Sequence, residues 1–386
     1  MIQGNDLHIV VFTDTFFETN GVASFYRTML KWCSQADGVR MTILCPPVKN
    51  INPSDVRPDV IPVRPVVNWR NPFYPDLRLG YFHEPTLRKL VRSFSDTKVI
   101  HVATSGPLGI AGAVLARRLK LPVVGCYHTD LGHYARLYGQ SVLGPPGAWL
   151  GKKVALMFDR AAYGRCLAVC APSTTAQTTV RTFYQGPTEI IPNPVDVDRF
   201  RPSPSRAGEF RNQYCGDRRL LAAVVGRVAK EKNLDLVCEL LGQDTRVQTI
   251  FVGDGPYAST LRKRWNAKVT GFLHGTALLE AYQQSDVFVQ LSTSETFGLS
   301  LVEALACGLP AMVLRSQGLA GCFTPESGVE VLEREDLPTL ADRCVSLVRD
   351  REQHRVRSRR VREFALTLGV DVVIPKFIEF HRAHAM

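Results

Sequence analysis

Two acidic residues, Glu295 and Glu303, stand eight positions apart in the segment SETFGLSLVE and are the strongest candidates for chemistry in this chain. We expect Glu295 to lie in a loop and Glu303 to lie six residues into a helix that begins near Phe297, about 9 Å along its axis. Backbone N–H groups at a helix start bind phosphate, whereas carboxylates repel phosphate and accept hydrogen bonds from hydroxyl groups. The pair therefore predicts a ligand with a central diphosphate, a sugar at one end and the ribose of a nucleotide at the other.

Cations that follow the predicted strand LLAAVVGR form a second group of candidates. Arg227 ends this stretch, and Lys230 and Lys232 come just before a predicted helix. An arginine can bond two phosphate oxygens as a fork and a lysine acts as a point charge, so Arg227 and Lys232 together suit a pyrophosphate. Lys230 is an alternative to Lys232 for this role.

The first half of the chain contributes weaker candidates, which lie at the ends of predicted strands. Gly21 precedes a predicted helix in TDTFFETNGVA, where a residue without a side chain lets a phosphate or a sugar approach the backbone; an ordinary turn is an equal alternative. His128 follows the predicted strand PVVGC and can exchange a proton near neutral pH or bond a sugar hydroxyl; a buried structural histidine is the alternative. His133 is a second candidate close by.

Apolar runs and helical patterns alternate along the chain, which is typical of parallel sheets wrapped by crossover helices. A length of 386 residues exceeds what one hydrophobic core usually supports, and the proline-rich stretch IIPNPVDVDRFRPSP interrupts the alternation. We therefore expect an N-terminal Rossmann-like domain at 1–190, a linker at 191–204, a C-terminal Rossmann-like domain at 205–366 and a final helix at 367–386. Periodicity leaves open whether that helix returns to the N-terminal domain.

Composition and charge narrow the class of protein. The chain is 45% hydrophobic and 22% charged, and it shows no secretion signal, no apolar run of bilayer length and no C-x-x-C pair. These features predict a cytoplasmic globular protein with reduced cysteines. Residues 1–190 carry 21 Lys/Arg against 12 Asp/Glu, and residues 191–386 carry 26 against 24. The basic first half favours an anionic partner, such as an acidic membrane surface, a phosphorylated acceptor or a nucleic acid, although a generally basic proteome would have the same effect.

Taken in order, the motifs of this chain resemble those of glycosyltransferase family 4. The resemblance covers nearly the whole chain and rests on TDTFFETNGVA, PVVGCYHTD, IIPNPVDVDRFRP, VVGRVAKEKNLDL, FVGDGP, VTGFLHG and SETFGLSLVEALACGLP. It implies the GT-B fold, in which two Rossmann-like domains face each other across a cleft. It also implies a retaining transfer of a hexose that needs no metal, with a UDP- or GDP-sugar as the donor substrate and no further cofactor.

The resemblance assigns roles to the four charged candidates of the second half. Arg227 and Lys232 would hold the diphosphate of the donor and stabilise the charge that develops on it during transfer. Glu303 would bind the ribose, and Glu295 would bind hydroxyls of the transferred sugar. All of these except Glu303 would be catalytic.

It also assigns roles to five further residues. The backbone N–H groups of Gly298 and Leu299 would lie near the donor, and backbone contacts near Phe272 would select the base. Gly21 would let the first loop close over the phosphates, and His128 would contact the sugar near the reacting centre as a catalytic residue.

Within the family, NGVASF and the HTD run that begins at His128 most resemble enzymes that glycosylate membrane lipids: α-mannosyl-, glucosyl- and sulfoquinovosyltransferases. A lipid or lipid-linked glycan is therefore the expected acceptor, with peripheral association at the cytoplasmic membrane face. One departure is that the usual Gly-Gly after the last core strand is replaced by 317–321, QGLAG. Two alternatives stay open: a GT-B nucleotide-sugar epimerase, and a non-catalytic basic module for membranes or nucleic acid, although no recognisable nucleic-acid motif accompanies the charge.

Overall fold

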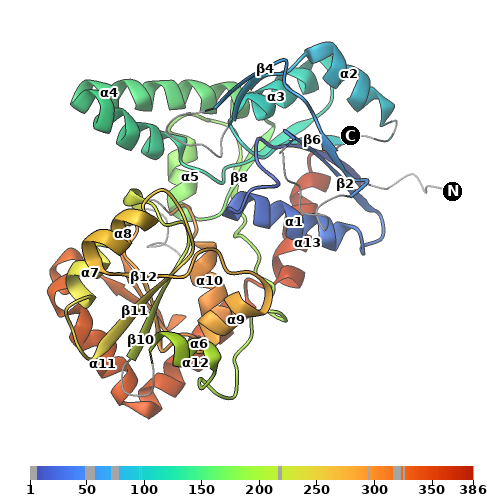
Figure 1. The fold of residues 1–386 in the computed structure, drawn as a ribbon. Coiled ribbons are helices and arrows are strands. Elements are labelled where there is room, and N and C mark those ends of the chain that lie inside the picture. The colour runs from blue at the N-terminus through green and yellow to red at the C-terminus, as the bar shows by residue number, and fades with distance from the viewer. Residues whose placement is uncertain are drawn as a thin grey trace. The chain divides into compact units, whose positions relative to one another are not determined.

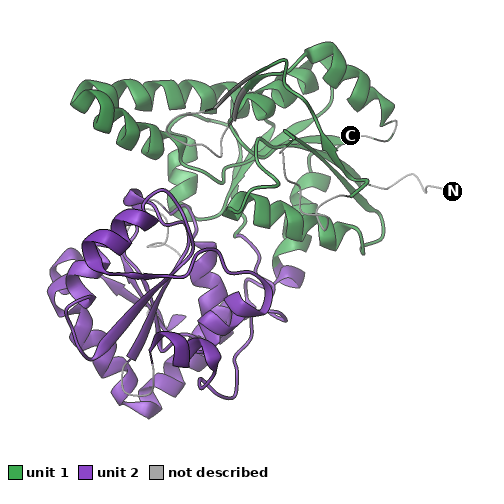
Figure 2. Ribbon diagram, viewed as in Figure 1, with its two compact units in different colours: residues 1–192, 373–386 green, residues 193–372 purple. Residues whose placement is uncertain are grey.

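The chain folds into two compact units in the computed structural model (Figure 2). Unit 1 comprises residues 1–192 and 373–386, and unit 2 comprises residues 193–372. The structure describes residues 7–47, 57–70, 78–94, 96, 98–215, 220–293, 295–315, 323–324 and 327–385. The segment 317–321, singled out above for its departure from the family pattern, lies outside the described residues.

Unit 1 is built on a seven-stranded sheet with the order β3-β2-β1-β6-β7-β8-β9, in which all neighbours run parallel (Figure 1). Its strands are β1 (Leu7–Phe12), β2 (Val39–Cys45), β3 (Val60–Pro62), β6 (Val99–Val102), β7 (Val123–Cys126), β8 (Ala168–Ala171) and β9 (Thr188–Ile190). A separate antiparallel pair consists of β4 (Val67–Arg70) and β5 (Arg78–Tyr81). The central strands are buried along their whole length because helices cover both faces of the sheet.

The helices of unit 1 come from both ends of the chain. They are α1 (Gly21–Cys33), α2 (Glu84–Ser93), α3 (Pro107–Leu119), α4 (Leu131–Tyr163), α5 (Thr174–Arg181) and most of α13 (Val370–Arg382). Phe377 of α13 packs against Phe25 of α1, with ring centroids 5.4 Å apart. The last helix is thus part of the core of unit 1, although the chain reaches it through unit 2.

Unit 2 repeats the architecture with a six-stranded parallel sheet of order β12-β11-β10-β13-β14-β15. Its strands are β10 (Leu220–Val225), β11 (Val247–Val252), β12 (Lys268–Val269), β13 (Val287–Gln290), β14 (Ala311–Leu314) and β15 (Glu330–Leu332). Its helices are α6 (Glu209–Tyr214), α7 (Leu234–Leu241), α8 (Ala258–Trp265), α9 (Gly275–Gln283), α10 (Leu299–Ala306), α11 (Leu340–Arg349) and α12 (Arg351–Leu366), with 3₁₀ turns η2 (Lys230–Lys232) and η4 (Arg334–Thr339).

Each sheet has a point where the strand order changes direction. The chain runs outward from β1 through β2 and returns to β6 on the other side of β1, and it does the same from β10 through β11 to β13. Loops that follow the two strands at such a point separate and leave a crevice at the carboxyl end of the sheet. In unit 2 these are the loops that carry Arg227 and Glu295.

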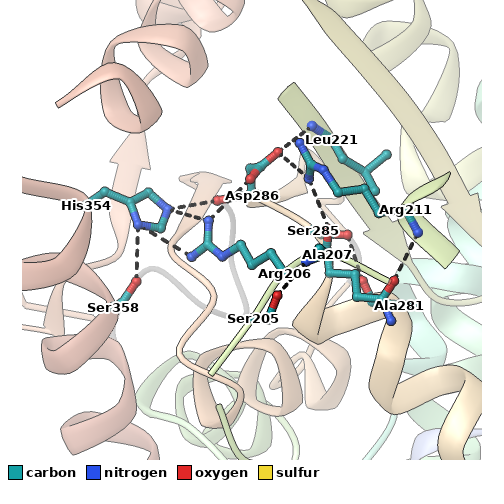
Figure 3. A network of polar contacts seen from close by, with 11 residues as sticks. Ser205, Arg206, Ala207, Arg211, Leu221, Ala281, Ser285, Asp286, His354 and Ser358 are labelled. Atoms are coloured by element: carbon teal, nitrogen blue, oxygen red, sulfur yellow. Dashed lines mark hydrogen bonds and ion pairs between the residues drawn. The ribbon is translucent and has the colours of Figure 1, made fainter. Parts of the chain in front are cut away.

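A buried carboxylate anchors the start of unit 2 (Figure 3). Asp286, just before β13, accepts hydrogen bonds from the Leu221 backbone N–H at 2.8 Å, from Arg211 at 2.8 Å and from Arg206 at 3.3 Å. Arg206 also contacts His354 of α12, with 3.0 Å between Nη1 and Nε2. Burial, and then the charge of Arg206, lower the pKa of His354. This network joins the connection before α6 to a central strand and to α12, and it has a structural role.

The structure defines two helices more closely than the sequence does. Helix α4 runs from Leu131 to Tyr163 with a break at Gly144, which has φ 63° and ψ −149°. Helix α10 begins at Leu299 rather than near Phe297, because Gly298 adopts a left-handed conformation with φ 87°.

Candidate active site

The loop after β10 carries the two predicted cations at the carboxyl end of the sheet of unit 2. Gly226 has φ 147°, and a Cβ added at Gly253, after the neighbouring strand β11, would lie 1.9 Å from the Gly226 carbonyl oxygen. These glycines let the ends of β10 and β11 approach closely. Arg227 follows immediately, and its guanidinium lies 3.6 Å from Glu231. Lys232 ends the 3₁₀ turn.

A short ion pair connects this loop to the one after β13. Nζ of Lys232 lies 2.6 Å from Oε1 of Glu295, and the Gln290 side-chain amide donates to the same oxygen at 3.3 Å. The Asn233 side chain donates to the Leu291 carbonyl at 2.9 Å and fastens the two loops together. Both members of the pair keep partial solvent access, at 16% and 18% side-chain exposure, so a ligand can reach them.

Glu303 lies on α10, four residues beyond the first residue of that helix. Oε2 of Glu303 accepts a hydrogen bond of 2.8 Å from the Tyr282 hydroxyl of α9. Burial raises the pKa of the Glu303 carboxyl to about 7, and the Tyr282 hydrogen bond opposes part of that rise. The carboxyl is therefore close to half ionised at neutral pH and can accept hydrogen bonds from hydroxyl groups in its ionised form.

Gly298 and Leu299 stand at the start of α10, between the two glutamates. The Gly298 carbonyl accepts from the N–H groups of Leu301 and Val302 at 3.1 and 3.2 Å, which closes the first turn. The first N–H groups of any α-helix have no partner inside the helix and point along its axis. Together with the helix dipole, they give this end a positive character that attracts an anion.

His128 of unit 1 belongs to a buried chain of polar rings. It follows β7, and its Nε2 lies 3.1 Å from the Tyr26 hydroxyl of α1. The same hydroxyl lies 2.6 Å from Nε2 of His101 on β6. Nδ1 of His101 lies 2.9 Å from Nε2 of His381 on α13, and Nδ1 of His381 lies 2.6 Å from the Phe377 carbonyl oxygen. This chain of polar rings thus connects four secondary-structure elements.

The end of this chain fixes the direction of every hydrogen bond in it. A carbonyl oxygen can only accept, so Nδ1 of His381 carries the proton. Burial lowers the pKa of His381 to about 4 and the pKa of His101 well below its ordinary value, so both rings are neutral at pH 7. His101 must then donate to His381, Tyr26 must donate to His101, and Nε2–H of His128 must donate to the Tyr26 oxygen. His128 is therefore held as the tautomer protonated on Nε2.

Gly21 is the first residue of α1, and nothing lies within 4 Å of a Cβ added there. The Asn20 side chain caps this helix by accepting from the Ala23 N–H at 2.9 Å. Earlier in the same loop, Asp14 is buried and caps α3 by accepting from the Leu108 N–H at 2.8 Å. Burial raises the pKa of Asp14 to about 6. The loop is therefore anchored at both ends, and its exposed part lies at Thr19 and at Gly21, where α1 begins.

The remaining candidates lie as follows. The Phe272 ring, in the loop between β12 and α9, is 47% exposed and stacks near His274 with centroids 6.4 Å apart. Lys230 is exposed on the turn whose other end carries Lys232. His133 is half-buried in the first turn of α4, where its backbone N–H donates to Asp130 at 2.8 Å.

Four residues close to the candidates were missed by the sequence interpretation: Tyr26, His101, Tyr282 and His381. The available signals were polar rings in apolar surroundings. His101 interrupts the strand VIHV, and His381 shares the inner face of α13 with Phe377. Such positions identify buried polar groups that need partners, but they do not say which partners.

Metal binding finds no support in the part of the chain that the structure describes: no group of three or more His, Cys, Asp or Glu side chains is arranged to hold an ion. Nine cysteines among these residues have free thiols, and all of them except Cys215 are buried. Likewise, no helix in the described ranges has the length and apolar character needed to cross a bilayer.

Comparison with solved structures identifies the fold class of this protein. The chain matches HepE of Anabaena, crystallised with UDP and glucose, with a TM-score of 0.74 at 17% identity, over 96% of this chain and 98% of that one. Two Rossmann-like units of this kind constitute the GT-B fold of glycosyltransferases, which confirms the predicted fold class.

Sequence comparison gives the family. The family model described as Glycosyltransferase Family 4 matches residues 19–199, and that described as Glycosyl transferases group 1 matches residues 209–364. A GDP-mannose-dependent alpha-mannosyltransferase of Mycobacterium tuberculosis is 33% identical over 72% of this chain and 71% of its own length. An alpha-monoglucosyldiacylglycerol synthase of Streptococcus pneumoniae is 27% identical over 79% of this chain and 70% of its own. The chain belongs to glycosyltransferase family 4, as its motifs predicted, and is a glycosyltransferase.

Proposed function

We propose that this glycosyltransferase transfers a hexose, with retention of anomeric configuration and without a metal, from a nucleotide diphosphate sugar to a hydroxyl of a membrane lipid or lipid-linked glycan. The observation that carries the proposal is the arrangement in unit 2. Two cations and one carboxylate stand on the loops after β10 and β13, a second carboxylate lies on α10, and Lys232 and Glu295 are in direct contact.

The donor fits this arrangement group by group. Its diphosphate lies between Arg227, Lys232 and the N–H groups at Gly298 and Leu299, where positive charge surrounds it. Glu303 accepts hydrogen bonds from the ribose hydroxyls. The base lies towards Phe272, whose exposed ring offers an apolar surface for stacking.

Glu295 and Lys232 act as a pair that recognises both parts of the donor. In the unliganded chain each neutralises the other at 2.6 Å. When the donor is bound, the carboxylate accepts from the sugar's hydroxyls while the ammonium group turns towards the departing phosphate. The pair therefore holds the bond between sugar and phosphate from its two sides.

In the transfer itself, the acceptor hydroxyl attacks the anomeric carbon from the face from which the diphosphate leaves. The bond between that carbon and the phosphate oxygen breaks, the new glycosidic bond forms, and the leaving phosphate oxygen takes the hydroxyl proton. Arg227 and Lys232 stabilise the negative charge that grows on the diphosphate. His128 and Gly21 contribute from unit 1, the histidine by contacting the sugar and the glycine by admitting the phosphates to its loop.

Two observations support the lipid acceptor and peripheral membrane association. One relative acts on diacylglycerol according to its name, as a synthase of alpha-monoglucosyldiacylglycerol. The first half of the chain also carries most of the excess positive charge, with 21 Lys/Arg against 12 Asp/Glu in residues 1–190. A cationic surface gains from an anionic leaflet by roughly 1 kcal/mol per cation close to it.

A thermal-shift panel of UDP- and GDP-sugars tests the donor site. A matched donor should raise the melting temperature, because a ligand that binds only the folded state stabilises it by mass action. Arg227→Ala and Glu303→Ala should remove this shift, and the matched control Lys230→Ala should keep it. If both site variants keep the shift, the donor site lies elsewhere.

Product analysis tests the reaction. Transfer should continue in EDTA and should yield the anomer of the donor, as read by NMR of the glycoside. Loss of activity in EDTA would overturn the metal-free reaction, and the opposite anomer would overturn retention. Conversion of the nucleotide sugar without an acceptor would instead indicate an epimerase.

A further inference from the structure

We propose that the outer face of α4 is the surface by which this enzyme docks on a bilayer that contains anionic phospholipid. This inference rests on the proposed lipid acceptor, and it names the element of unit 1 that makes the contact. It is carried by the exposure, the charge and the packing of α4.

The exposed face of α4 is unusually apolar. Beyond the break at Gly144, Trp149 is 64% exposed, Leu150 50% and Met157 60%, and just before the break Leu143 is 64% exposed. Buried positions on the same helix, such as Ala155, lie on the opposite side. A helix with Trp and Leu on its open face has the pattern of an interfacial helix that lies in the plane of a membrane surface.

The exposed charged side chains of this helix are all cationic, since its one acidic residue, Asp159, is buried. From 131 to 158 the sequence contains no Asp or Glu, while Arg136, Lys152 and Lys153 supply cations. Nζ of Lys153 lies 5.7 Å from the centroid of the Trp149 ring. A tryptophan with cations beside it matches the boundary between acyl chains and anionic headgroups, where the ring is buried and the ammonium group meets phosphate.

The packing of α4 explains why the large side chains point outward. Its two segments, 131–143 and 145–163, form a helical hairpin, and the backbones approach closely where both carry small residues (Figure 1). A Cβ added at Gly139 would lie 2.1 Å from the Gly147 carbonyl oxygen, and one added at Gly151 would lie 2.2 Å from that of Ala135. No large side chain fits between segments this close. The hairpin is therefore a compact body with small residues inside and apolar residues outside.

A bilayer suits this surface better than a protein partner. A protein interface would need complementary shape and hydrogen bonds, whereas this face offers flexible apolar side chains bordered by lysines. Charge complementarity selects a leaflet with anionic lipid. A second copy of the chain would place the cations of one α4 against those of the other, which opposes pairing of two such faces.

Vesicle sedimentation of the full chain tests the docking surface. Wild type should bind vesicles of 70% phosphatidylcholine and 30% phosphatidylglycerol at least ten-fold more tightly than pure phosphatidylcholine vesicles. The double variant Leu150→Ser/Met157→Ser and the double variant Lys152→Ala/Lys153→Ala should each lose most of this binding. Leu167→Ser is the matched control, since Leu167 is an equally exposed apolar residue of unit 1 outside α4. The assignment is wrong if Leu167→Ser loses vesicle binding as strongly as the α4 variants do. It is also wrong if the α4 variants retain vesicle binding.

A second readout places the helix directly. Brominated lipids should quench the tryptophan fluorescence of wild type, and Trp149→Phe should remove most of that quenching. Unchanged quenching in this variant would overturn the proposal. Light scattering tests whether a second copy of the chain occupies this face. A dimer in solution that dissociates on Leu150→Ser would make the face a contact between copies and would overturn the membrane assignment.

Failure of the docking surface is distinguishable from failure of the proposed function. The α4 variants should keep the donor thermal shift and the transfer to a water-soluble short-chain acceptor, while transfer to an acceptor in vesicles falls at least ten-fold. A wild type with a normal donor shift and no affinity for anionic vesicles would overturn the docking proposal alone. A wild type that sediments with vesicles and shows no shift with any nucleotide sugar would overturn the donor site alone.

Discussion

The candidate site residues of both units follow the carboxyl ends of parallel strands, but they use opposite electrostatics. In unit 2 the loops after β10 and β13 hold full charges in contact, as in the Lys232–Glu295 pair, with partial access to solvent. In unit 1 the residues around His128 form a buried chain of neutral rings whose charged forms are suppressed by burial. The carboxyl end of one sheet thus carries a charged group of residues, and that of the other carries a neutral one.

This difference shows how burial decides what a polar group can do. A partly exposed ion pair can exchange its partner for a ligand at a lower cost than a buried one, because water reaches both states. A buried neutral chain cannot exchange partners without leaving a polar atom unsatisfied. We therefore expect unit 2 to respond to substitutions of charge and unit 1 to respond to substitutions that break hydrogen-bond direction.

The largest effect should come from removing a cation of unit 2. Arg227→Ala or Lys232→Ala should lower kcat about 10²–10³-fold, because each leaves the charge that develops on the diphosphate without a preorganised partner. Steady-state kinetics with the donor found in the panel measure this loss. The matched control Lys230→Ala should stay within about two-fold. If kcat falls less than five-fold in both site variants, the charges of unit 2 do not have the role that the comparison gives them.

The next largest effect should come from Glu303→Gln, which should improve stability while it damages donor binding. The folded-state pKa of about 7 is raised above the ordinary 4.5, so the stability that this carboxyl contributes is fully present below pH 4.5 and is lost as pH rises through 7. That loss is at most about 3 kcal/mol.

Melting curves at pH 5 and pH 8 measure the difference. The variant should melt above wild type at pH 8 by on the order of 5 °C. The gap should be much smaller at pH 5. Donor affinity of wild type should rise with pH through about 7, as the carboxylate forms, and that of Glu303→Gln should not. Equal gaps at the two pH values would mean that this carboxyl does not ionise near neutrality.

A smaller effect should follow from breaking the neutral chain of unit 1 at its far end. His381→Ala removes the acceptor that orients His101, and through Tyr26 it should let His128 sample both tautomers. We expect kcat to fall by about ten-fold. The donor thermal shift should stay unchanged. ¹⁵N NMR of the histidine rings reports the tautomer directly.

Two variants sharpen this test. His381→Gln keeps an oxygen acceptor and should restore most of the activity. His384→Ala removes a histidine of the same helix whose ring bonds the Phe380 carbonyl, outside the chain, and should have little effect. If activity falls while the His128 tautomer stays the same, the hydrogen-bonded rings contribute only to packing and do not orient His128.

Salt should have the smallest effect and should separate the two regions. Raising NaCl from 50 to 500 mM shortens the screening length from above 10 Å to well below it. The KM for the donor should then rise by roughly two- to five-fold with a soluble acceptor. The tautomer of His128 should not respond, because its partners are buried. A salt-independent KM would argue that the donor's charge is not recognised by Arg227 and Lys232.

Much of the fold follows from the sequence for a physical reason. Strands such as LLAAVV are apolar on both faces because helices cover both, and a run like this between turn residues is readable without a structure. A segment whose structure depends on packing against another segment is harder to predict. The sequence of α4 carries little helical signal, because Gly132, Gly139 and the pair Pro145–Pro146 mask a pattern that depends on close packing of two segments.

Four charged candidates, Arg227, Lys232, Glu295 and Glu303, were selected from residue type and spacing, the last on a helix and the others on loops after strands. Of these, the structure brings Lys232 and Glu295 into contact. The partners of His128 could not be predicted, because Tyr26, His101 and His381 come together only through the sheet order and the return of α13. Pairings between residues 280 positions apart leave no local trace in a sequence.

The return of α13 to unit 1 also sets an order of events during synthesis. Residues 7–192 leave the ribosome first, yet Phe25 and His101 wait for partners on a helix that is made after all of unit 2. A nascent first unit therefore carries an uncovered apolar groove with an unsatisfied histidine until translation passes residue 381. We expect chaperones to bind the nascent chain at that stage. We also expect fragments that stop near residue 190 not to reach the native fold of unit 1.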